Sequence, residues 1–393
     1  MTGQNSVYGG ITVKRKSAIL LMTAALLCAQ TSVYAGSDEV ITDLGEYGFE
    51  YIDDGYDVRD NMPSETMYTH DRRIWIPLLS DDKKYFILMT NSNNYYEDGK
   101  VRVPDSYISD EYGQRYVVSI LGSSDLKEFD LNPKNKYMKL IDNVVFSKDG
   151  KSLMSYAKFD ERKKYAVPDG TEIIKQQAFE CTDLTELFIP DSVTEIEKRA
   201  FAGMSSLEKI SIPFLAEELN DTFWSCENLK EVYIPEKSKL RKISGITFSG
   251  TKISELTLPS FDIEIDKVAF VNCNKKNCIT LKSYVKPDVK AKYVNSKGKY
   301  QLKWDKIPNA SEYEVYQKLR DGSYKLLKTT KGTSIKLNGI KSGKKYTFAV
   351  KPIAKIKASG DGTSGMVSYV WYDLPKYYTI EGTMSDDVTF TAK

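Results

Sequence analysis

Histidine is almost absent from this chain of 393 residues, which contains only His70. One imidazole excludes catalytic histidine pairs, His-rich metal sites and relays of several imidazoles. Long apolar runs are also scarce, because the only one covers residues 18–28. A multi-span membrane protein is therefore excluded, and the composition excludes collagen and coiled coils. The length instead predicts two or three domains, and the 41% hydrophobic content is typical of a globular protein.

The N-terminus has the pattern of a secretory signal peptide. Residues 14–16 (Lys-Arg-Lys) precede the apolar run, and Val33-Tyr34-Ala35 follows it. This pattern predicts a signal peptide over residues 1–35, with cleavage after Ala35. The run is short for a transmembrane anchor, and Leu27 before Cys28 disfavours lipidation. We expect a secreted, extracellular or cell-surface product with no transmembrane segment after cleavage.

Charge is distributed unevenly along the rest of the chain. Residues 36–285 carry 32 Lys or Arg against 44 Asp or Glu, a net charge of −12. Residues 286–357 carry 19 against 5, a net charge of +14, and residues 358–393 carry 2 against 5, a net of −3. Opposite charges in adjoining segments predict separate modules with separate surroundings.

The middle of the chain is an internal repeat with a period of about 22 residues. Two columns keep this register, one of proline (Pro168, Pro190, Pro213, Pro235 and Pro259) and one of phenylalanine (Phe179, Phe201, Phe223, Phe248 and Phe270). A short alternating segment before most of the prolines predicts one strand per repeat. Because one such unit cannot bury its apolar face, the units are expected to stack into a solenoid.

The repeat resembles the BspA-like leucine-rich repeat family of bacterial surface proteins. The resemblance rests on the pattern Ile189-Pro190, Val193, Ile196, Ala200-Phe201 and Leu207. Degenerate copies extend it upstream, so we predict a solenoid over residues 101–285 behind an N-terminal cap region, 36–100. The predicted fold class is mainly β with short helical or irregular repeat segments, a solenoid followed by an antiparallel β-sandwich.

Four cysteines remain after signal cleavage. Cys181 and Cys226 are predicted to occupy one column two repeats apart, about 10 Å, which exceeds the reach of a disulfide. Both are therefore expected to be buried free thiols. Cys273 and Cys278 lie close together at the last repeat, where a disulfide and two reduced thiols both remain open.

Residues 286–373 change character to short alternating segments separated by Gly, Asn, Asp and Ser. This spacing predicts an antiparallel sandwich, with residues 374–393 left as a C-terminal tail. The order of Trp304, the Tyr313-Glu-Val-Tyr316 segment and residues 340–346 is similar to the fibronectin type III family. The resemblance implies that Tyr346 forms that family's tyrosine corner.

The repeat strands predict a candidate ligand-binding face. If Leu187, Ile210, Val232 and Leu256 point inward, the residues beside them point outward in two ladders. The ladders are Phe188, Ser211, Tyr233 and Thr257, and Glu186, Lys209, Glu231 and Glu255. Exposed aromatic residues are typical anchors for a protein or glycan ligand. The alternative is that these side chains only cover the sheet.

The lysine-rich segment 286–357 has two interpretations. It is either a solvated surface or a contact for a polyanion such as an anionic cell-wall polymer. Nucleic acid is not expected as a partner, because no nucleic-acid motif accompanies the lysines.

No catalytic residue, cofactor or metal site is predicted. His70 lies in a Tyr-rich segment and is interpreted as a loop residue. We therefore expect a non-enzymatic binding or adhesion protein whose partner is a host or microbial surface protein or glycan, with the basic module as spacer or wall contact. Two alternatives stay open: a component of extracellular polysaccharide degradation, whose paired carboxylates need no histidine, and a structural surface-layer component.

Overall fold

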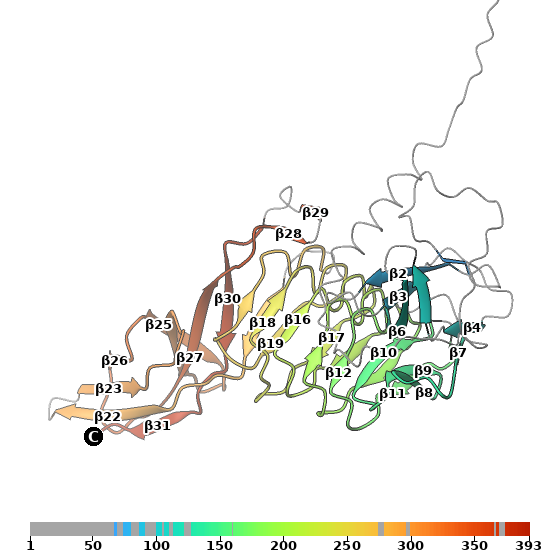
Figure 1. The fold of residues 1–393 in the computed structure, drawn as a ribbon. Helices are drawn as coiled ribbons and strands as arrows, with labels where there is room; N and C mark the ends of the chain where they lie inside the picture. The colour runs from blue at the N-terminus through green and yellow to red at the C-terminus, as the bar shows by residue number, and fades with distance from the viewer. Residues whose placement is uncertain are drawn as a thin grey trace, which may run out of the picture.

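The protein is built from strands and irregular turns. The computed structural model describes residues 127–158, 160–273, 279–295, 299–364, 367–368 and 374–393, together with short strands between residues 67 and 121. No helix occurs in these residues. A solenoid occupies the middle of the molecule and a β-sandwich one end (Figure 1). The predicted signal peptide and His70 lie outside the described residues.

The N-terminal strands form a sheet ahead of the solenoid. Its order is β1-β2-β3-β6-β5. The bounds are β1 Met67–Tyr68, β2 Ile74–Leu79, β3 Phe86–Thr90, β5 Ser106–Ser109 and β6 Gly113–Leu121. Separately, β4 (Lys100–Val103) pairs in parallel with β7 (Glu128–Leu131), which is the pairing expected of consecutive repeats. A three-stranded antiparallel meander follows, formed by β8 Met138–Ile141, β9 Val144–Ser147 and β10 Ser152–Tyr156.

The solenoid has two rows of short parallel strands, one strand of each row per repeat. The first row is β11 Lys164–Ala166, β13 Glu186–Phe188, β15 Lys209–Ser211, β17 Glu231–Tyr233, β19 Glu255–Leu258 and β21 Thr280–Ser283. The second row is β12 Ile173–Ile174, β14 Glu195–Ile196, β16 Glu218–Asn220, β18 Lys242–Ser244 and β20 Glu264–Ile265. Equivalent residues pair in register, as in Ile210 with Val232 and Leu219 with Ile243.

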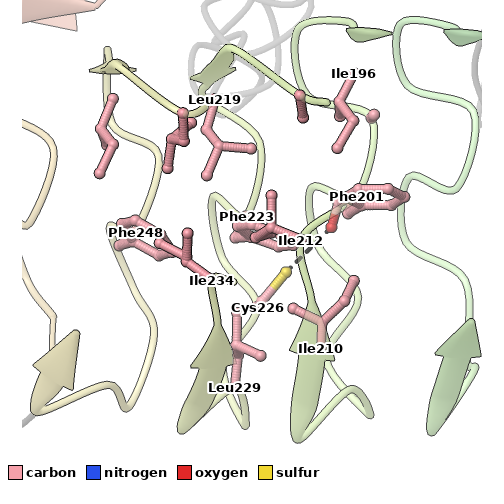
Figure 2. Close-up of a cluster of buried hydrophobic side chains, with 14 of the residues drawn as sticks. Ile196, Phe201, Ile210, Ile212, Leu219, Phe223, Cys226, Leu229, Ile234 and Phe248 are labelled. Atoms are coloured by element: carbon pink, nitrogen blue, oxygen red, sulfur yellow. Dashed lines mark hydrogen bonds between the residues drawn. The ribbon is translucent and has the colours of Figure 1, made fainter. Parts of the chain in front are cut away.

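The core lies between the two rows, where the phenylalanine column forms a continuous stack of rings. Centroids of successive rings from Phe179 to Phe270 are 5.7, 5.5, 5.7 and 5.4 Å apart. Ile210, Ile212 and Ile234 approach the stack from the first row, and Ile196 and Leu219 from the second (Figure 2). Because each ring packs on the next repeat, the period of the sequence is the period of the core.

The prediction that both Cys181 and Cys226 are buried is wrong for Cys181. Cys226 is a buried free thiol that donates to the carbonyl oxygen of Phe201 at 3.1 Å, whereas Cys181 is exposed. The two residues are in different columns. Cys181 follows its phenylalanine by two residues and has φ 58°, like Ser225, whereas Cys226 follows by three. The buried Cys226 column also holds Thr251 and Cys273; Cys278 lies outside the described residues.

The sandwich has the predicted antiparallel sheets. One contains β22 Val289–Asn295, β23 Lys299–Trp304 and β26 Ser334–Leu337; the other contains β24 Glu312–Lys318, β25 Tyr324–Thr330 and β27 Lys345–Lys357. Trp304 and Tyr313 pack between them with ring centroids 5.4 Å apart. The hydroxyl of Tyr346 accepts a hydrogen bond from the backbone N–H of Lys341 at 3.0 Å, so Tyr346 does form a tyrosine corner.

Residues 374–393, predicted as a tail, contribute two structural strands. β31 (Val388–Thr391) pairs with the start of β27 and completes the sandwich. β30 (Tyr377–Gly382) pairs with the end of β27 on one side and in parallel with β21 on the other. Every second residue of β30 is buried, which is the pattern of a strand with one face in a core. This strand closes the end of the solenoid, and Tyr378 extends the ring stack beyond Phe270.

Candidate ligand-binding face

All eight predicted residues lie on β13, β15, β17 and β19, on the face of the first row that points away from the core. Leu187, Ile210 and Leu256 are buried beneath them, and Val232 is partly buried. Between β15 and β17, Lys209 pairs with Glu231 and Ser211 with Tyr233, so the middle of each ladder is a cross-strand pair. We call this surface the candidate face. That it binds a ligand remains a prediction.

The charged ladder is largely satisfied by its own neighbours. Lys164 Nζ lies 2.7 Å from Glu186 Oε1, and Lys282 Nζ lies 2.5 Å from Glu255 Oε2. Lys209 and Glu231 stand directly opposite each other on paired strands. Opposite charges across strands stabilise a sheet by roughly 0.2–1 kcal/mol each. These residues therefore have a structural role whether or not a ligand binds.

The aromatic ladder has no such internal explanation. Phe188 and Tyr233 are each 58% exposed, the largest exposed fractions of apolar side chains on the first row. They stand two strands apart, about 10 Å, with only the hydroxymethyl group of Ser211 between them. The equivalent positions on the strands to either side also have small side chains. Ala166 on β11 pairs with Phe188, and Thr257 on β19 follows Tyr233 in the ladder. The two rings therefore project beyond the small side chains that neighbour them in the ladder.

The candidate face continues into the sandwich, which was not predicted from the sequence. In the continuous sheet β19-β21-β30-β27-β24, Lys282 pairs with Glu381, and Lys351 on β27 pairs with Glu314 on β24. The alternating segment 377–382 was the available signal. Its pairing partners lie far away in the sequence, so the alternation alone does not show where this strand joins the sheet.

Lys351 is the centre of a charge cluster where the two modules meet. Its Nζ lies 2.9 Å from Glu381 Oε2, 3.0 Å from Glu314 Oε2 and 5.7 Å from the centre of the Tyr316 ring. Burial alone would lower the pKa of Lys351, but the two carboxylates raise it above its usual value. The Tyr316 hydroxyl donates to Glu314 at 2.5 Å. This network holds the β30–β27–β24 junction in one arrangement.

Two cavities lie where the solenoid meets the sandwich. One of about 400 Å³ opens on the candidate face and is lined by Lys282, Tyr284, Lys351 and Glu381, among others. The other, of about 480 Å³, is lined by Lys267, Asp361 and Tyr377, among others. Each is lined by a single carboxylate. Neither offers the carboxylate pair that glycoside hydrolysis needs.

Two further features were sought in the part of the chain that the structure describes. No group of three or more His, Cys, Asp or Glu residues gathers there in a way that would hold a metal ion. The same residues include no helix of the length and hydropathy needed to cross a membrane.

Comparison with known families identifies both modules. Residues 152–282 match the model of the BspA type leucine rich repeat region in six copies. These residues are a BspA-type leucine-rich repeat region. Residues 287–361 match the model of a PBP1-like, fibronectin3-like domain, so the BspA-type region is followed by a fibronectin-like sandwich, as predicted. The second match ends before β30 and β31.

Three solved structures of bacterial proteins are similar to part of the chain. A leucine-rich repeat protein from Eubacterium ventriosum is 15% identical, with 44% of this chain and 56% of that chain covered and a TM-score of 0.32. The pneumococcal vaccine antigen PcpA is 21% identical, with 47% and 51% covered and a TM-score of 0.34. The T. pallidum protein TpLRR is 21% identical, with 53% and 78% covered and a TM-score of 0.29. The chain thus spans about half the length of the first two structures. No curated protein matches the sequence.

Proposed function

We propose that the protein is a secreted or cell-surface binding protein whose BspA-type region holds a host or microbial surface protein or glycan on the candidate face. The observation that carries this proposal is the exposed pair Phe188 and Tyr233, each 58% exposed above small neighbours. The basic N-terminal segment and apolar run of residues 14–28 support export. The BspA-type family, whose members are bacterial surface proteins, supports a binding role.

Aromatic side chains suit this role for a physical reason. Each ring buries a large area on binding while only two side-chain torsions are fixed, so little conformational entropy is lost. The repeats hold the two rings at a fixed spacing because their core rings, Phe179, Phe201 and Phe223, stack on one another. Burial of both rings would therefore contribute most of the binding energy, and the paired charges around them would contribute specificity.

The experiment compares surface binding of the full chain with that of the variant Phe188→Ser/Tyr233→Ser. Fluorescently labelled protein is applied to a glycan array and to host and bacterial cells. The matched control is Leu327→Ser/Tyr377→Ser, which removes two exposed apolar side chains, 41% and 63% exposed, from other surfaces. We expect the first variant to lose about tenfold or more in affinity and the control to keep it.

The two variants also define the result that contradicts the proposal. Equal retention of binding by both, on every array ligand or cell type that the wild type binds, would show that the aromatic ladder only covers the sheet. Circular dichroism and thermal unfolding confirm that each variant is folded. Both pairs of side chains are exposed, so stability changes within about 0.5 kcal/mol are expected.

A further inference from the structure

The lysines of the sandwich are not spread evenly over its surface. Five of them point outward from the three-stranded sheet of β22, β23 and β26, alternating with buried core residues. They are Lys290, Lys292, Lys299, Lys303 and Lys336, all exposed. We call this surface the lysine face. No acidic residue pairs with these lysines across the three strands, since Asn295, Gln301 and Ser334 occupy the remaining paired positions.

The register of these strands sets lysines against each other. Lys290 on β22 pairs directly with Lys303 on β23, and Lys292 and Lys336 flank Gln301 on either side. Like charges directly opposite in a sheet are destabilising. Among the described residues, Lys290 alone of the five has an ion pair, with Asp288 at 3.3 Å, where both side chains are largely exposed. In the sequence, residues 296–298 between β22 and β23 are Ser-Lys-Gly and add no acid. One exposed ion pair therefore offsets the Lys290–Lys303 repulsion only in part.

The opposite sheet of the same domain shows that this arrangement is not a general property of the sandwich. There three lysines are paired with carboxylates. The pairs are Lys355 with Glu312, Lys351 with Glu314 and Glu381, and Lys318 with Asp387. A surface that serves only solubility intersperses both signs of charge. One face of this domain does so, and the lysine face does not.

We propose that the lysine face binds an extended polymer, other than a nucleic acid, that carries phosphate or sulfate groups. The inference deepens the proposed function, because it assigns the sandwich the contact that retains the protein at a surface. Charge complementarity points to a polyanion. An extended chain fits because the lysines form a continuous row: Lys290 and Lys292 are about 7 Å apart along β22, and Lys290 and Lys303 about 5 Å apart across strands. Binding would neutralise the Lys290–Lys303 repulsion, so the cost present in the free protein becomes part of the driving force.

The test uses the full chain and the variant Lys292→Gln/Lys303→Gln/Lys336→Gln. Its matched control is Lys325→Gln/Lys328→Gln/Lys331→Gln, which removes the same charge from edge strand β25 and the loop after it. Binding of linear polyphosphate and of heparin is measured by calorimetry at two salt concentrations. We expect the lysine-face variant to lose about tenfold or more in affinity for the preferred polymer and to show a weaker salt dependence. The control should lose about threefold or less.

The outcomes separate the sources of the ligand and the competing explanations. Preference for polyphosphate indicates a phosphate polymer, and preference for heparin a sulfated glycan; both support the proposal. It is overturned if the two variants lose equal affinity, if neither polymer binds at low salt, or if single-stranded DNA binds more tightly than both. Self-association of the wild type that the lysine-face variant abolishes would also overturn it, by identifying a second copy of this chain as the occupant. Phe188 and Tyr233 are unchanged in these variants, so failure here is distinguishable from failure of the candidate face.

Discussion

Among single residues, Cys226 shows how the repeat core controls chemistry. Its thiol is fully buried, and burial raises its pKa to about 12. Since the thiolate is the reactive form, we expect iodoacetamide at pH 8 to leave Cys226 unmodified in the native protein and to modify it in urea. Peptide mass spectrometry checks this residue by residue. Stoichiometric modification of Cys226 without denaturant would contradict the buried position.

The same residue has a consequence for the pH dependence of stability. The thiol titrates near 9 when unfolded and near 12 when folded. The contribution of the neutral buried thiol to stability is therefore complete below pH 9 and is lost as the pH rises from 9 towards 12.

At the scale of single residues, prediction from sequence fails where a residue lies one position away from the repeat column to which it is assigned. The phenylalanine column was found because five residues keep one period, and it is continuous in the structure. Cys181 lies at the position of Ser225, one residue before the buried column, because it follows its phenylalanine by two residues instead of three. The sequence also contains a signal for part of the lysine face, since Lys299 and Lys303 alternate with Tyr300, Leu302 and Trp304. Which lysines stand opposite one another depends on strand register, which alternation alone does not give.

At the scale of elements, strand β30 depends on a glycine at its end. A Cβ on Gly382 would lie 2.5 Å from Pro352 Cγ and 2.6 Å from the carbonyl oxygen of Val285. Gly382→Ala should therefore push β30 away from β27 and from the segment after β21, at a cost of about 1–3 kcal/mol. The measurement is the free energy of unfolding in urea.

Gly332→Ala is the control for this substitution. The nearest atom to a Cβ at Gly332 is Thr330 Oγ1 at 3.6 Å, an ordinary contact, so stability should stay within about 1 kcal/mol of the wild type. Equal effects of the two substitutions would show that β30 does not pack as closely as the structure indicates.

The elements divide into those with local signals and those without. The repeat strands were predictable because each is bounded by a proline and recurs with one period. The tyrosine corner was predictable because it joins residues five apart, Lys341 and Tyr346. β30 and β31 carried alternating patterns, but their partners are β21 and β27. In the sequence β30 lies between β27 and β31, yet it pairs with β21 of the solenoid. Such long-range pairing has no signature in a single sequence.

For the whole molecule, the main feature is that the two modules share a sheet. β19 and β21 belong to the solenoid, β27, β24 and β25 to the sandwich, and β30 joins them. Ala354, Ala358, Tyr378 and Ile380, which lie after the BspA-type region, are part of the solenoid core. The solenoid carries a net charge of only −3 over residues 101–285 (26 Lys or Arg against 29 Asp or Glu), and the sandwich is strongly basic. The two modules therefore differ in charge but are not independent in structure. A ligand held on the lysine face would fix the orientation of the candidate face.

This shared sheet predicts that solenoid and sandwich unfold together. Calorimetry of the wild type should show one transition whose calorimetric and van't Hoff enthalpies agree. Ile380→Asp places a charge in the fully buried junction, which should separate the modules and split the transition in two. Thr379→Asp adds the same charge one residue away on the exposed side of β30 and should keep a single transition. Two transitions in the wild type, unchanged by Ile380→Asp, would mean that the modules are only tethered. A single transition means that force or ligand binding at the sandwich is transmitted to the candidate face through paired backbone rather than through a flexible linker.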